Sequence, residues 1–210
     1  MASDLYAHLR TAGSSPAPLV FAFHGTGGDE HQLLDIAGQV LPGAPVVAPR
    51  GDVLEHGAAR FFRRTGEGAY DMADLAARTR KMAQFVAAEA GGTRPLVGIG
   101  YSNGANILAA VLFAEPALFD AAVLMHPLIP FEPQLAGPLA GRQVLITAGR
   151  RDPICPPGLT RRLAEALIAG GAKVELEWHD GGHELRPAEL TAAHRFLAPL
   201  ASGIAAKGDR

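Results

Sequence analysis

Short apolar runs recur along the chain and predict a series of buried strands. Each run is a few residues long and is bounded by glycine, proline or polar residues, which is typical of strands covered on both faces. The predicted strands are residues 19–23, 45–48, 96–99, 121–125, 143–148 and 173–179.

Segments with a helical pattern lie between these runs. In residues 74–90 the larger apolar side chains recur near helical spacing, and Gly91 with Gly92 closes the segment as a helix stop should. Further helices are predicted at residues 105–114, 158–169 and 187–200. Strands and helices therefore alternate along the chain.

This alternation predicts an α/β fold in which a single, mostly parallel sheet carries helices on both faces. We expect residues 1–210 to form one domain, because no linker or change of composition divides the chain. Residues 52–68 are predicted to be a long surface loop. Residues 127–142 leave too little chain for a large lid, so we expect a minimal lid and an open site.

Gly100-Tyr101-Ser102-Asn103-Gly104 follows a predicted strand and precedes a predicted helix. This is the context of a nucleophile elbow, a strained turn in which small flanking residues let the backbone bend and expose the serine hydroxyl. The alternative is a serine in an ordinary glycine-rich turn. We predict Ser102 as the nucleophile of a serine hydrolase.

A serine triad on this fold needs an acid and then a histidine in chain order, each at the carboxyl end of a strand. Asp152 follows the predicted strand 143–148, and His183 follows the predicted strand 173–179 on a loop opened by Gly181 and Gly182. We therefore predict Asp152 and His183 as the partners of Ser102.

Other residues compete for these two roles. His179 competes with His183 but belongs to a strand, whereas His183 lies on a flexible loop. Asp180 lies three residues before His183, and Asp120 precedes a strand instead of following one. Asp152 could also be a simple turn residue before a proline.

The tetrahedral intermediate of ester hydrolysis needs two backbone N–H donors. Asn103, directly after the nucleophile, should supply one, and Thr26 in the loop His24-Gly25-Thr26-Gly27-Gly28 should supply the other. His24 itself is expected to be a structural hydrogen-bonding residue at a strand end.

Composition limits the classes of partner and cofactor that we expect. The formal net charge of -2 favours no nucleic acid and no membrane, and a small-molecule ester remains the expected partner, with a homodimer left open. Cys155 is the single cysteine, so no internal disulfide can form and a cytoplasmic location is expected. The histidines lack zinc-site spacing, and we expect no metal and no cofactor.

Four segments together resemble the phospholipase/carboxylesterase family of α/β-hydrolases: HGTGGDE at 24–30, GYSNGAN at 100–106, AGRRDPICPP at 148–157 and GGHEL at 181–185. Arg60-Phe61-Phe62-Arg63-Arg64 resembles the bacterial carboxylesterase branch linked to hydroquinone detoxification. The resemblance implies the triad Ser102, Asp152 and His183, with Thr26 and Asn103 as oxyanion donors. Asn103 stands where acyl-protein thioesterases more usually have Gln.

We therefore expect a serine carboxylesterase that acts on small or short-chain esters through an acyl-enzyme. Phe61, Phe62, Arg63 and Arg64 either line the site, where an Arg would pair with a carboxylate, or form a core Phe pair beside solvated arginines. A thioesterase or C–C bond hydrolase could use the same triad, and a non-catalytic binding protein could use the same scaffold. Dienelactone-type hydrolysis is disfavoured because the nucleophile is Ser and not Cys.

Overall fold

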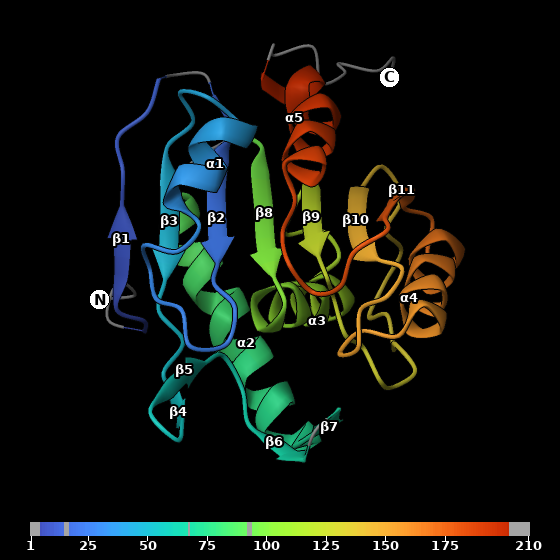
Figure 1. Cartoon of the computed structure of the whole chain (residues 1–210). Coiled ribbons are helices and arrows are strands. Elements are labelled where there is room, and N and C mark those ends of the chain that lie inside the picture. Colours follow the sequence, from blue (N-terminus) through green and yellow to red (C-terminus); the bar gives the residue numbers. More distant parts are fainter. Residues whose placement is uncertain (1–4, 15–16, 67, 92–93, 202–210) are drawn as a thin grey trace.

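A seven-stranded sheet forms the centre of the protein, in the order β1-β3-β2-β8-β9-β10-β11 (Figure 1). The computed structural model describes residues 5–14, 17–66, 68–91 and 94–201. The strands are β1 His8–Arg10, β2 Leu19–Phe23, β3 Val46–Pro49, β8 Leu96–Tyr101, β9 Ala121–Met125, β10 Gln143–Gly149 and β11 Lys173–His179. β1 pairs antiparallel with β3, whereas the other neighbours pair in parallel.

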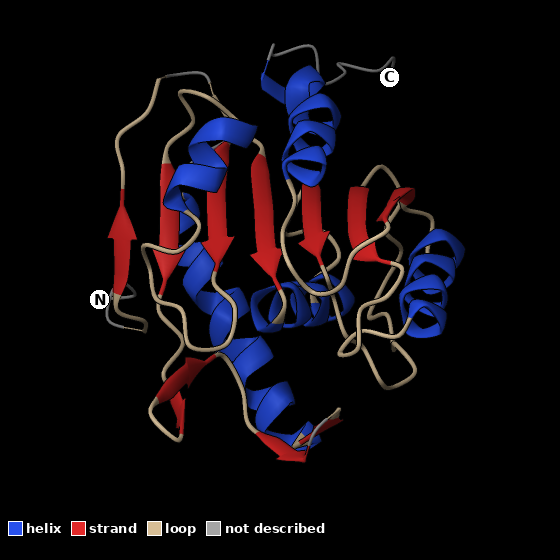
Figure 2. Ribbon diagram, in the orientation of Figure 1, coloured by secondary structure: helices blue, strands red, loops and turns tan. Residues whose placement is uncertain are grey.

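Helices cover both faces of the sheet, as Figure 2 shows. They are α1 Leu34–Val40, α2 Met72–Ala90, α3 Asn103–Ala114, α4 Pro157–Ala169 and α5 Pro187–Ala201. Alternate residues of β2 divide between two cores: Phe21 packs in the core with α2, α3 and α4, and Val20 packs in the core with α1 and α5. Parallel strands need such double cover because both faces of the sheet are apolar.

Two small hairpins lie beyond the carboxyl ends of the parallel strands, at the bottom of Figure 1. The first pairs β4 Val53–Glu55 with β5 Ala58–Arg60, and the second pairs β6 Arg64–Gly66 with β7 Ala69–Tyr70. Between the hairpins, Phe61 and Phe62 are fully buried. Residues 52–68 were predicted to be a surface loop, and this prediction was wrong in that the segment pairs with itself and contributes to the core.

Helix α2 illustrates how local sequence sets the ends of an element. Asp71 is its N-cap, and the Asp71 carboxylate accepts the Asp74 backbone N–H at 3.0 Å. At the other end Gly91 adopts the left-handed conformation with φ 48°. The predicted glycine stop is therefore where the helix ends.

The predicted α/β fold is confirmed, and the predicted strands agree with the observed ones to within two residues. β1 and α1 were not predicted. Residues 126–142, between β9 and β10, contain neither helix nor strand, in agreement with a minimal lid. In the part of the chain that the structure describes, no helix is long and apolar enough to cross a membrane.

Candidate active site

Ser102 lies on a sharp turn between β8 and α3, at the carboxyl edge of the sheet. It is the N-cap of α3, with φ 52° and ψ -116°. A positive φ is costly for a residue with a side chain and persists only where the surrounding structure enforces it. This backbone conformation is that of a nucleophile elbow.

Two glycines make the elbow sterically feasible. A Cβ on Gly100 would lie 2.6 Å from the Gly104 carbonyl oxygen, and a Cβ on Gly104 would overlap the carbonyl groups of Phe23 and His24. Real Cβ atoms essentially never come that close to other heavy atoms. The G-x-S-x-G spacing is therefore a packing requirement of the turn.

The three predicted triad residues lie in one hydrogen-bonded chain. Nε2 of His183 is 2.9 Å from Oγ of Ser102, and Nδ1 of His183 is 2.7 Å from Oδ2 of Asp152. In this arrangement Nδ1–H donates to the carboxylate, which leaves the Nε2 lone pair facing the serine hydroxyl. The structure thus brings together residues from three separate loops.

Asp152 is held by several donors. Its Oδ1 accepts the backbone N–H groups of Ile154 at 2.8 Å and Cys155 at 2.9 Å, and its side chain is fully buried. Burial by itself would raise the pKa of Asp152, but hydrogen bonds from two imidazoles and two backbone N–H groups lower it well below its usual range. Asp152 is therefore ionised.

The loop that carries His183 is fixed against neighbouring segments. Tyr101 donates its hydroxyl to the His183 carbonyl at 2.7 Å, and the Arg151 N–H donates to the Gly181 carbonyl at 2.9 Å. A Cβ on Gly149 would overlap the Gly182 carbonyl, so the acid loop and the histidine loop are in close backbone contact. This contact sets the distance between the two side chains.

The predicted oxyanion donors come from two segments, the start of α3 and the loop after β2. Asn103 is the first residue of α3, so its N–H belongs to the first turn of the helix, whose donors have no partner within the helix. In the loop before α1, the N–H groups of Gly25, Gly27 and Gly28 each donate a hydrogen bond to another residue of the protein. The N–H of Thr26 has no acceptor among the residues that the structure describes.

The first hairpin supports this loop. Arg60 donates Nη1–H to Oγ1 of Thr26 at 2.8 Å, and Gly27 donates its N–H to the Ala59 carbonyl at 2.9 Å. The Phe61 N–H donates to Oδ1 of Asn103 at 2.8 Å, which anchors the second predicted donor as well. The first hairpin and the residue that follows it therefore hold both candidate donors in place.

His24 has the structural position that the sequence predicts. Its Nδ1 is 2.7 Å from the Gly25 carbonyl, and its Nε2 accepts the Gly51 N–H at 2.9 Å. Burial lowers the pKa of His24, so the ring stays neutral while it ties two loops together.

A cavity of about 450 Å³ opens beside Ser102. Polar and apolar side chains share its wall: Thr26, Arg60, Arg64, Tyr70, Tyr101, Asn106, Leu128, Ile154 and His183. A cavity of this size suits a small ligand.

Of the four predicted substrate-binding residues, one lines the cavity and three do not. Arg64 lines the cavity, whereas Phe61 and Phe62 lie in the core and Arg63 pairs with Asp74 at 3.2 Å. The structure does not bring Phe61, Phe62 or Arg63 to the cavity wall. The two rings lie in the core that includes Leu75 of α2, and of the arginines in this segment Arg60 and Arg64 line the cavity.

Sequence reasoning missed His126 and Glu189, which lie directly behind Asp152. His126 follows β9, and its Nδ1 is 2.9 Å from Oδ2 of Asp152. Glu189, near the start of α5, lies 3.1 Å from Nε2 of His126. A histidine at the carboxyl end of the strand next to the elbow was the available signal.

Comparisons with known proteins identify relatives of the chain. The dienelactone hydrolase family matches residues 9–199. The Bacillus subtilis protein MhqD is 38% identical over 194 residues, which cover 90% of this chain and 96% of MhqD.

Two solved structures are similar to this chain over nearly its whole length. Atu2452 of Agrobacterium tumefaciens, a protein of unknown function, has a TM-score of 0.90 and 57% identity, over 95% of this chain and 99% of its own. A Bacillus cereus carboxylesterase has a TM-score of 0.91 and 37% identity, over 95% and 96% of the two chains. The predicted resemblance to bacterial carboxylesterases is confirmed, and these relatives support a hydrolase or esterase function. The chain belongs to the dienelactone hydrolase family and has the α/β-hydrolase fold.

Proposed function

We propose that the protein is a serine carboxylesterase that hydrolyses small or short-chain carboxylic esters through an acyl-enzyme intermediate. The single observation that carries the proposal is the hydrogen-bonded chain from Ser102 Oγ through His183 to Asp152, with distances of 2.9 and 2.7 Å. A serine hydroxyl is a weak nucleophile and needs a base within hydrogen-bond reach, itself oriented by a third group.

In the first half of the reaction, His183 Nε2 takes the Ser102 proton as Oγ forms a bond to the ester carbonyl carbon. The carbonyl oxygen becomes an oxyanion that accepts hydrogen bonds from the N–H groups of Thr26 and Asn103. Collapse of the tetrahedral intermediate breaks the bond to the alcohol oxygen, which leaves with the proton from His183.

In the second half, water replaces the alcohol. His183 takes a proton from the water while the water oxygen attacks the acyl carbon. The second tetrahedral intermediate then expels Ser102 Oγ, which recovers its proton from His183. Throughout, Asp152 holds the imidazole with Nδ1–H toward the carboxylate and stabilises the imidazolium. The products are a carboxylic acid and an alcohol.

The size of the cavity supports the substrate class. A volume of about 450 Å³ accommodates a small ester, and the segment between β9 and β10 adds no helix that would build a long acyl channel. We therefore expect activity to fall as the acyl chain of a p-nitrophenyl ester lengthens. Faster turnover of long-chain than of short-chain esters would contradict this substrate class.

The test of the mechanism is Ser102→Ala, with Ser14→Ala as the matched control. Ser14 is exposed, and its hydroxyl donates to the Gly43 carbonyl far from the elbow. Ser102→Ala should lose both hydrolysis of p-nitrophenyl butyrate and labelling by a fluorophosphonate, while Ser14→Ala keeps both. Equal turnover by the two purified variants would remove Ser102 from the mechanism.

A further inference from the structure

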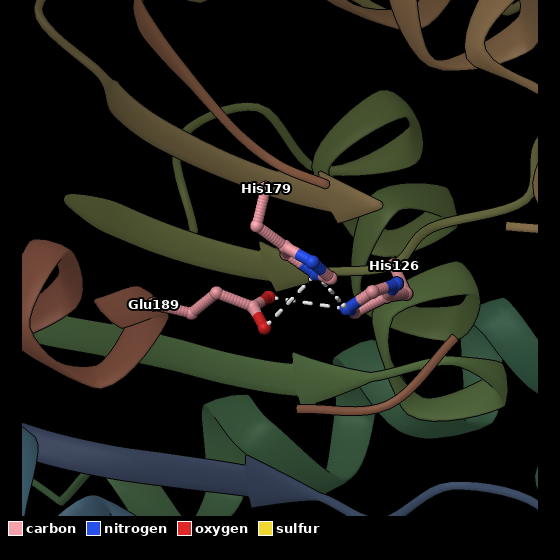
Figure 3. Close-up of side chains that lie close together, drawn as sticks. All are labelled: His126, His179 and Glu189. Atoms are coloured by element: carbon pink, nitrogen blue, oxygen red, sulfur yellow. Dashed lines mark hydrogen bonds and ion pairs between the residues drawn. The ribbon is translucent and has the colours of Figure 1, made fainter. Parts of the chain in front are cut away.

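A buried polar cluster lies behind Asp152, and the proposed reaction uses none of its members except that carboxylate. It consists of His126, Thr147, Asp152, His179 and Glu189 and is called the His126 cluster below. Figure 3 shows three of these side chains pointing toward one another: His126 after β9, His179 at the end of β11 and Glu189 on α5. Buried polar groups of this kind are costly unless they are fully hydrogen-bonded.

Glu189, like Asp152, accepts hydrogen bonds inside the protein and lies beside two imidazoles. Oε1 accepts the Thr147 hydroxyl at 2.5 Å and Oε2 accepts the Arg186 N–H at 2.7 Å, while imidazole nitrogens lie 3.1 Å and 3.3 Å away. Burial by itself would raise the pKa of Glu189, but the hydrogen bonds lower it. Both carboxylates that flank His126 are therefore ionised.

His126 lies between these two carboxylates. Nδ1 is 2.9 Å from Asp152 and Nε2 is 3.1 Å from Glu189, and the ring is fully buried. A neutral imidazole leaves a lone pair on one nitrogen, which on Nε2 would face both Glu189 and Nε2 of His179, 3.4 Å away, whereas an imidazolium places a proton toward each carboxylate. Burial opposes the charge, but the hydrogen bonds to Asp152 and Glu189 raise the pKa of His126 to about 9.

His179, unlike His126, is assigned as a neutral imidazole. Its Nδ1 accepts the Gly181 N–H at 3.0 Å, so the ring proton resides on Nε2, which lies 3.4 Å from Nε2 of His126 and 3.3 Å from a Glu189 oxygen. A metal held by His126, His179 and Glu189 would need the Nε2 lone pair of His179. The hydrogen bond from Gly181 assigns a proton to that position, which favours a hydrogen-bonded cluster over a metal centre.

The backbone of His126 is held in an unfavourable conformation. Its φ is 51°, a left-handed value that is rare for a residue with a side chain. The His126 N–H donates to the Thr147 carbonyl at 2.8 Å, and the His126 carbonyl accepts the Cys155 thiol at 3.3 Å. Such strain persists where the surrounding structure requires one side-chain position, and here it aims the ring at Asp152.

We propose that His126 is a cationic positioning residue of the esterase site, an imidazolium shared by Asp152 and Glu189 that orients the triad carboxylate and opposes protonation of His183. The proposal rests on the function proposed above. It extends the triad from Ser102 to Glu189, so that α5 and β9 take part in setting the base. His126 does not line the cavity and is not a catalytic residue.

The sign of the effect on His183 follows from the charges that surround His126. The groups that face it are Asp152 and Cys155 after β10, Glu189 on α5, His179 on β11, His183 after β11 and Tyr101 on β8. The His126 and His183 rings are 5.1 Å apart, and Glu189 lies beyond His126. Loss of the nearer positive charge therefore makes His183 easier to protonate, even if Glu189 becomes neutral at the same time.

A first experiment reads the charge directly in the unmodified protein. In ¹⁵N-labelled protein at pH 7, both ring nitrogens of His126 should give the imidazolium signature in a long-range ¹H–¹⁵N correlation spectrum. Loss of one pair of signals in His126→Asn assigns the ring. A neutral signature for His126 would overturn the proposal, and this reading does not depend on whether the variant is active.

A second experiment measures kcat/KM against pH for wild type, His126→Asn and the control His179→Asn. Asn can still donate to Asp152 but carries no charge, so the acid limb of the profile should move about one pH unit toward higher pH. His179→Asn disturbs the same cluster without removing a positive charge, so its acid limb should stay with that of wild type.

An unmoved acid limb in folded His126→Asn, or an equal shift in both variants, would contradict the role of the charge. Failure of the His126 proposal can be distinguished from failure of the proposed esterase function. If Ser102→Ala retains turnover, the function fails; if Ser102→Ala is inactive and the acid limb does not move, only the role of His126 fails.

Discussion

Nδ1 of His126 lies 2.9 Å from Oδ2 of Asp152, the same oxygen that faces His183. The two imidazoles reach this oxygen from the loops after β9 and β11, while backbone N–H groups hold Oδ1. Asp152 thus has a single rotamer in which all of its acceptor sites are used. The carboxylate of the predicted acid is therefore positioned by contacts from several separate loops.

Asp152→Asn should lower kcat by about 10³- to 10⁴-fold, because an amide cannot hold the imidazole in the required tautomer or stabilise its charge. The matched control is Asp180→Asn, since Asp180 is exposed and pairs with Arg150 on the surface. Asp180→Asn should keep wild-type turnover of p-nitrophenyl butyrate. A large loss in the control with little loss in Asp152→Asn would reassign the acid.

Gly104→Ala should destabilise the fold by about 3 kcal/mol, because the added Cβ would overlap the Phe23 and His24 carbonyl groups and neither backbone can move without disturbing β2. Gly158→Ala on α4 is the control, since a Cβ there meets no atom within 4 Å. The control should be neutral or slightly stabilising. Urea unfolding of both variants measures the difference, and equal midpoints would show that the elbow tolerates a Cβ.

Arg64→Ala should raise KM for an ester that carries a carboxylate by about 3- to 5-fold and leave a matched neutral ester unchanged, because the guanidinium lines the cavity and is partly exposed. Arg63→Ala is the control, since Arg63 faces Asp71 and Asp74 outside the cavity. Equal losses for both esters in Arg64→Ala would dismiss charge pairing.

The stability that His126 contributes should depend on pH. Its pKa rises from 6.5 in the unfolded chain to about 9 in the folded protein, so the contribution is fully present below pH 6.5 and is lost as pH rises through about 9. The free energy of unfolding of wild type relative to His126→Asn should therefore fall by about 3 kcal/mol between pH 6 and pH 10. Urea titrations across this range measure it, and a difference independent of pH would contradict a buried imidazolium.

Much of the architecture could be predicted from local patterns. Buried parallel strands are continuous apolar runs, and several of the helices between them begin at a proline or end at a glycine. Most ends of helices and strands can therefore be predicted from residues close in the sequence. β1 and α1 escaped prediction because they are short. β1 is defined by its backbone pairing with β3, and the seven residues of α1 are held by packing beneath α5.

The sequence by itself determined which loops carry Ser102, Asp152 and His183, because the order of strands brings their carboxyl ends to one edge. The tertiary structure decided what faces them. Arg64 and Arg63 are chain neighbours, yet only the packing of the hairpin selects which of them reaches the cavity. His126 and Glu189 meet behind Asp152 because the fold brings the residue after β9 against the start of α5, which is distant in sequence, and no local pattern encodes such a contact.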